Sequence, residues 1–108
     1  MQAALAADPR DAGQTRLLVK HFLAVLVERA PGASVEVRVP PYAAVQAVAG
    51  IRHTRGTPPA VVELDADTWI ALATGDVAWA DVERVGRVRA SGERADLSAF
   101  LPLATGDA

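Results

Sequence analysis

The stretch Ala49–Pro59 holds the residues best suited to binding an anion. It places Arg52, His53 and Arg55 beside Gly56, and no apolar period runs through it. Two guanidinium groups, together with open backbone N–H groups, can hold a carboxylate or a phosphate through charge-assisted hydrogen bonds. A solvated basic loop without any ligand explains the same residues. Arg52, His53 and Arg55 are therefore candidate contacts for the charged headgroup of a ligand.

Carboxylates occur in two close pairs, Asp65/Asp67 and Asp76/Asp81. Paired carboxylates are one arrangement that could act in acid–base catalysis. Each pair, however, stands where a helix is expected to begin. An acidic side chain at that place caps free backbone N–H groups and complements the helix dipole. We therefore expect these four residues to serve helix starts rather than catalysis.

His21 falls inside a predicted helix and has apolar neighbours. It could be a ligand or an acid–base residue, but we expect a boundary residue because no second ligand is visible. Two histidines and no cysteine argue against a transition-metal site. The Gly-x-Ser-x-Gly, His-Glu-x-x-His, P-loop and dinucleotide-binding patterns are also absent from the sequence. The sequence predicts no catalytic residue, no metal, no cofactor and no enzymatic activity.

The composition predicts a single domain over residues 1–108, with a flexible N-terminal segment at 1–13 and a C-terminal tail at 102–108. Apolar residues make up 51% of the chain and aromatic residues 5%, so the core must consist mainly of Val, Ala and Leu. A net charge of −2 offers no basic field to nucleic acid. The chain lacks cysteine, a long apolar run and a basic N-terminal region, so we expect a cytoplasmic protein without stable membrane insertion.

The first half of the chain predicts one helix followed by three strands. The helix is expected over Gln14–Arg29. Ser34–Val39 alternates Val with polar residues, as a half-buried strand does, and should form an antiparallel hairpin with Tyr42–Val48. Ala60–Leu64 is expected to be a third, well-buried strand. The apolar stripe of the helix comprises Leu17, Leu18, Phe22, Leu23, Val25 and Leu26.

The second half predicts a helix, a short helix, a strand and a final helix. Asp65 can cap the first of these helices. Gly75 and Gly86 can end the first and the second, because glycine adopts the left-handed conformation without steric cost. Arg87–Ser91 has the alternation of a strand, and Ala95–Leu101 is expected to be the final helix. The apolar residues of the short helix and the final helix are Trp79, Val82, Val85, Leu97, Phe100 and Leu101.

Two blocks of this second half resemble the sterol carrier protein type-2 family, a group of small lipid-binding domains. The blocks are Ile70–Gly75, IALATG, and Gly86–Gly92, GRVRASG. Members of the family have a similar leucine-alanine-leucine-x-threonine-glycine helix end. A glycine, a basic–apolar–basic strand and a second glycine follow it at a similar distance. Val35–Gly50 is compatible with the family's opening hairpin, whereas Ala49–Pro59 leaves little room for the distinct edge strand of typical members.

The resemblance implies an α/β (α+β) fold, with a mainly antiparallel sheet of about four or five strands and helices on one face. It also implies an apolar tunnel between sheet and helices, which binds a fatty acid, an acyl-CoA or a sterol-like lipid without catalysis. The same apolar residues could instead simply fill the core. The expected tunnel residues are Phe22, Leu26, Trp69, Ile70, Leu72, Ala73, Trp79, Val82, Leu97, Phe100 and Leu101.

A protein-interaction or accessory module with a filled core is the alternative function. Such a module would bind no ligand and would pair through its N-terminal helix or an exposed sheet edge, as a homodimer or with a partner protein. A filled interior favours this alternative. An open apolar channel favours a lipid, or another hydrophobic small molecule, as the partner.

Overall fold

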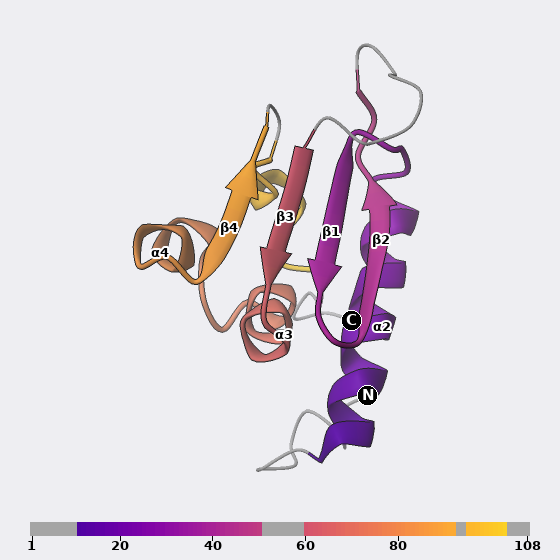
Figure 1. Ribbon diagram of the computed structural model, residues 1–108, viewed down its shortest axis with the longest axis vertical. Helices are drawn as coiled ribbons and strands as arrows, with labels where there is room; N and C mark the ends of the chain where they lie inside the picture. Colours follow the sequence, from indigo (N-terminus) through magenta and orange to yellow (C-terminus); the bar gives the residue numbers. More distant parts are fainter. Residues whose placement is uncertain (1–10, 51–59, 93–94, 104–108) are drawn as a thin grey trace.

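The computed structural model describes residues 11–50, 60–92 and 95–103. Its elements follow the predicted order of helix, three strands, two helices and a strand, and only the last element differs from the prediction (Figure 1). The elements are α2 (Ala12–Arg29), β1 (Val35–Val39), β2 (Ala43–Ala47), β3 (Ala60–Leu64), α3 (Ala66–Thr74), α4 (Trp79–Arg84), β4 (Val88–Ser91) and the 3₁₀ helix η1 (Ser98–Phe100).

The four described strands form one mixed sheet in the order β2-β1-β3-β4. The β1–β2 and β3–β4 pairs are antiparallel, and the central β1–β3 pair is parallel. The predicted α+β fold with a mostly antiparallel sheet is thus confirmed for the described residues. In Figure 1, α2 runs behind β2, and α4 lies beside β4.

One face of the sheet is buried because its strands alternate Val with polar residues. Val35, Val37 and Val39 of β1 are fully buried. Between them, Glu36 is half-buried, and the exposed Arg38 donates to its carboxylate at 3.0 Å on the other face. The helices therefore cover the valine face, and the opposite face remains polar.

Helix α2 begins at Ala12, two residues earlier than the sequence suggested. Asp11 caps it: its Oδ1 accepts from the Gln14 N–H at 2.7 Å, and the Gln14 side chain accepts from the Asp11 N–H at 3.0 Å. The prediction that Leu17 belongs to the buried stripe is wrong, because its side chain is 54% exposed. Val19 is buried instead, since the stripe runs along Leu18–Phe22–Leu26 and Val19–Leu23, which turns Leu17 outward.

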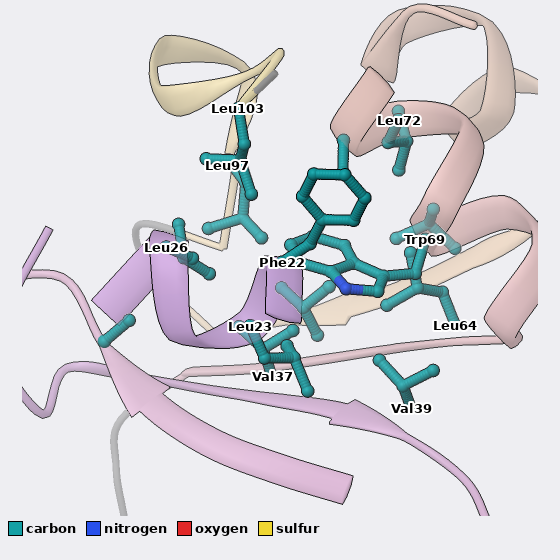
Figure 2. Packing of buried hydrophobic residues seen from close by; sticks show 14 of the residues in the cluster. Phe22, Leu23, Leu26, Val37, Val39, Leu64, Trp69, Leu72, Leu97 and Leu103 are labelled. Atoms are coloured by element: carbon teal, nitrogen blue, oxygen red, sulfur yellow. The ribbon is translucent and has the colours of Figure 1, made fainter. Parts of the chain in front are cut away.

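Trp69 of α3 occupies the centre of the core and is fully buried. Its indole Nε1–H donates to the carbonyl oxygen of Val19 in α2 at 3.3 Å, so the two helices are joined by a hydrogen bond as well as by packing. Figure 2 shows the surrounding apolar side chains, which come from both helices, the strands and the C-terminal segment. The residues labelled there are Phe22, Leu23, Leu26, Val37, Val39, Leu64, Trp69, Leu72, Leu97 and Leu103.

Two expectations for the second half need correction. Val85 does not continue the buried stripe of Trp79 and Val82; it is 63% exposed, because α4 ends at Arg84. The predicted helix Ala95–Leu101 is reduced to the single turn η1. Leu101 is extended, with φ −110° and ψ 148°, as expected for a residue that precedes a proline.

Hydrogen bonds between Ser34 and Val48 hold together the open end of the β1–β2 hairpin. The buried Ser34 donates to the Val48 carbonyl oxygen through its N–H at 3.0 Å and through its hydroxyl at 2.6 Å. The Val48 N–H donates to the Ala30 carbonyl at 2.6 Å, and the Ala60 N–H donates to the Ser34 carbonyl at 3.2 Å. Gly32 lies against this cluster, where a Cβ would overlap the Val48 carbonyl. These contacts hold the end of α2, the hairpin and the start of β3 together.

Asp65 fixes the start of α3. Its carboxylate accepts from the Thr68 N–H at 3.1 Å and from the Thr68 hydroxyl at 2.6 Å. Burial by itself raises the pKa of the Asp65 carboxyl, but these hydrogen bonds and the charge of Arg87 outweigh it. The pKa of Asp65 therefore lies below its ordinary value of 3.8.

Gly32→Ala is expected to lower the free energy of unfolding by more than about 2 kcal/mol, because the new Cβ meets the Val48 backbone in addition to the strain of a positive φ of 150°. Gly86→Ala is the matched control. Gly86 has a left-handed φ of 78° but open space around its Cα, so only the backbone conformation should cost energy, about 1 kcal/mol. Urea unfolding of both variants measures the difference, and equal losses would contradict the overlap.

Asp65→Ala is expected to lower the free energy of unfolding by about 1 kcal/mol at neutral pH, because it removes the cap. Asp65→Asn tests the charge alone. A carboxyl whose pKa is lowered in the folded state stabilises the protein above its unfolded pKa, and this contribution disappears as the pH falls through the folded pKa. The stability gap between the native protein and Asp65→Asn should stay constant above about pH 5 and shrink as the pH falls below that, through the lowered pKa of the folded Asp65. A gap that stays constant would show that the carboxylate charge contributes nothing.

Candidate functional site

A groove of about 650 Å³ lies where α3, α4 and the C-terminal segment meet. Small-molecule sites in proteins usually occupy about 300–1,000 Å³, so this volume suits a ligand. Most of its wall is apolar, and its two ionisable residues are both aspartates. The lining residues are Leu72, Gly75, Asp76, Val77, Ala78, Trp79, Ala80, Asp81, Ser98, Leu101 and Pro102.

The abrupt end of α3 shapes one side of the groove. Gly75 has a left-handed φ of 88° and ends the helix, as predicted. The next two backbone N–H groups, those of Asp76 and Val77, both donate to the Ala71 carbonyl, at 2.9 and 3.4 Å. This tight turn provides hydrogen-bond donors for the Ala71 carbonyl group in the last turn of the helix. It also places Val77 in the wall of the groove.

The C-terminal segment forms the opposite side and is tied to two helices. The Leu103 N–H donates to the Ala73 carbonyl of α3 at 2.9 Å, and Arg29 of α2 donates to the Pro102 carbonyl at 3.3 Å. The Leu103 side chain is buried in the core. These anchors hold Leu101 and Pro102 against the groove, with Pro102 next to Gly75.

The two tryptophans of the chain have different roles. Trp69 is a core residue whose indole N–H has a partner, the Val19 carbonyl. Trp79 lies at the start of α4, lines the groove and is also buried, yet its indole nitrogen has no hydrogen-bond partner among the described residues. Buried N–H groups almost always have one, so the free donor of Trp79 is an exception located at a cavity.

The charges at the groove are negative. Asp76 and Asp81 belong to its lining, whereas none of its described lining residues is basic. Arg84 donates to Asp81 at 3.2 Å and so compensates that carboxylate in part. Asp76 is exposed and follows the end of α3, where the helix dipole is also negative.

The residues predicted to line a tunnel occupy two different places. Leu72, Trp79 and Leu101 are in the groove lining. Phe100 is half-buried against the core. The others are buried in the core cluster: Phe22, Leu26, Trp69, Ile70, Ala73, Val82 and Leu97. Arg52, His53 and Arg55, the predicted headgroup contacts, lie outside the described residues.

Sequence reasoning missed Val77, Ala78 and Pro102 as lining residues. They lie in connecting segments, where no helix or strand period marks the buried side. The available signal was the apolar pair Val77-Ala78, which starts two residues after the helix stop at Gly75 and is followed by Trp79. That pair points to a contact surface, but it does not identify the partner surface, which comes from the C-terminal segment.

Two smaller cavities lie elsewhere in the described chain. One, of about 420 Å³, is lined by Ala12, Gly13, Arg16, Pro41 and Tyr42. The other, of about 250 Å³ near Asp65, mixes the acidic Glu63 with the basic Arg87 and Arg89. His21 is exposed, and its ring packs edge-on against Phe22. No cluster of three or more metal-ligating side chains occurs within residues 11–50, 60–92 and 95–103. In the same part of the chain, no helix has both the length and the apolar character needed to cross a bilayer.

Comparison with known proteins agrees with the fold. No curated protein matches the chain. A family model described as "bacterial SCP ortholog" matches residues 11–103, which is most of the sequence and includes every described element. The match contains both glycine-bounded blocks and the groove between α3, α4 and the C-terminal segment. The chain therefore belongs to the family of bacterial sterol carrier protein (SCP) orthologs.

Proposed function

We propose that this protein binds a hydrophobic small molecule, of the lipid class, in the groove between α3, α4 and the C-terminal segment. The observation that carries the proposal is an apolar groove of ligand size, bordered by a tryptophan, in a member of the SCP ortholog family. The family membership favours a lipid as the ligand. The groove supplies an accessible apolar surface at the rim of the core cluster.

The energetics of burial support a lipid chain in this groove. Each methylene removed from water contributes about 0.8 kcal/mol, so about ten buried methylenes offer roughly 8 kcal/mol. Immobilising the ligand reduces this binding free energy by several kcal/mol. The remaining roughly 4–5 kcal/mol corresponds to dissociation constants of about 0.2–1 mM for an acyl chain that is held only along part of its surface.

The proposed role is binding without chemical conversion. Acyl transfer or hydrolysis needs a nucleophile, a base and oxyanion donors in one place. Ser98 carries the only hydroxyl among the described lining residues, and no histidine or lysine belongs to that lining. The groove residues are suited to hold and release a ligand.

Ala78→Phe is expected to abolish or strongly weaken lipid binding. Ala78 lines the groove, and its exposed side chain makes no cap hydrogen bond, so the larger ring can fill the groove with little strain. Stability should change by less than about 0.5 kcal/mol, while affinity for a long-chain fatty acid methyl ester falls about tenfold or more. Native mass spectrometry and the fluorescence of Trp79 measure binding.

Ala44→Phe is the matched control, because Ala44 is an exposed β2 residue that does not line the groove. It should bind lipid as the native protein does. Equal binding by both variants would place the ligand elsewhere. No saturable binding by the lipid-free native protein would reject the proposal and favour the interaction module.

A further inference from the structure

We propose that the groove selects lipids whose polar end is an uncharged oxygen acceptor, with Trp79 donating its indole N–H to that oxygen and Asp76 disfavouring a carboxylate. This inference rests on the proposed function and specifies the ligand class. The two determinants are independent of each other. One is an unused hydrogen-bond donor, and the other is the sign of the charge at the groove.

The donor argument depends on the contrast between the two tryptophans. Both are buried, at 0% exposed for Trp69 and 4% for Trp79. Trp69 has its hydrogen bond to Val19, whereas the Trp79 nitrogen has no partner in the described part of the chain. A buried donor without a partner costs free energy that an apolar ring such as Phe would not cost at this position. A ligand oxygen that reached the nitrogen would recover that cost, and Trp79 belongs to the groove lining.

The nitrogen is now covered by neighbouring atoms. A ligand oxygen reaches it only by displacing the side chains that cover the indole. The bond therefore forms on binding, not before it. An oxygen with a free lone pair, as in an ester, a ketone or an alcohol, satisfies this donor. A hydrocarbon without oxygen leaves it unpaired.

The charge argument separates an ester from a carboxylate. Asp81 is partly compensated by Arg84 at 3.2 Å, so Asp76 contributes most of the uncompensated negative charge at the described lining. A carboxylate entering the groove meets repulsion from Asp76, whereas a neutral ester of the same chain length does not. Comparing the affinities for methyl dodecanoate and dodecanoate measures the effect of this charge, because the two ligands have the same chain length.

Nitrogen–proton correlation spectra test the donor directly. With methyl dodecanoate, the indole proton of Trp79 should move downfield as it gains an acceptor. The indole proton of Trp69, already bonded to Val19, should stay within its linewidth and serves as the internal control. Assignment follows from Trp79→Phe, which removes one of the two indole signals and leaves that of Trp69. A Trp79 signal that does not move at saturation would overturn the proposed bond.

Calorimetric titration of variants tests selectivity. Trp79→Phe keeps an apolar ring and should weaken methyl dodecanoate binding about 3- to 10-fold without lowering the melting temperature. Asp76→Asn should strengthen dodecanoate binding about 2- to 5-fold at low ionic strength and change the affinity for the ester by a smaller factor. Glu28→Gln, an exposed carboxylate of α2 outside the groove, is the control and should change neither affinity.

The outcomes separate this inference from the proposed function. If ester and carboxylate bind the native protein and all variants with equal affinity, the groove binds the hydrocarbon chain and does not discriminate between polar groups at its end. The inference is then wrong, and the proposed function stands. If neither probe binds the native protein at all, the proposed function fails and the inference fails with it.

Discussion

The structure depends on the burial of one indole ring between two helices. Trp69 is the largest fully buried side chain. A chain with few aromatic residues has few ways to fill the space between a sheet and its covering helices, and one tryptophan can bury about 150–250 Å². The hydrogen bond to Val19 fixes the ring and with it the position of α3 against α2. The sheet, the end of α3 and all that follows are arranged around this contact.

The accessible apolar groove lies at the rim of the domain, beside the core cluster. Trp69, Phe22 and Leu26 are buried in the core cluster, whereas the groove of about 650 Å³ lies where α3 stops and the chain turns back. The helix end at Gly75 is thus both a structural stop and the edge of the groove. The C-terminal segment completes the groove from the other side, so three parts of the chain that are separate in sequence contribute one surface.

The sequence was sufficient to predict the features with a local cause. Residue types and short spacing predict the alternation of Val in β1 and the helix cap at Asp65. They also predict the left-handed backbone conformation of Gly75 and Gly86. Features decided by packing between distant segments were not predictable in this way. The spacing of Leu97 and Leu101 suits a helix, but Pro102 and the docking of Leu103 on Ala73 favour an extended chain. The same limit applies to the two tryptophans, because only the assembled core decides which one has a partner.

Ser34 has a consequence for how this fold can vary among related sequences. It bonds to Val48, where the connection between β2 and β3 begins, and to Ala60, where that connection ends. Both ends of the connection are therefore held at one residue of the sheet. Changing the number of residues between fixed ends costs little, since each doubling of a loop adds only about 0.6 kcal/mol. Evolution or a protein engineer could replace this connection, with its arginines, as an independent module while the sheet stays the same.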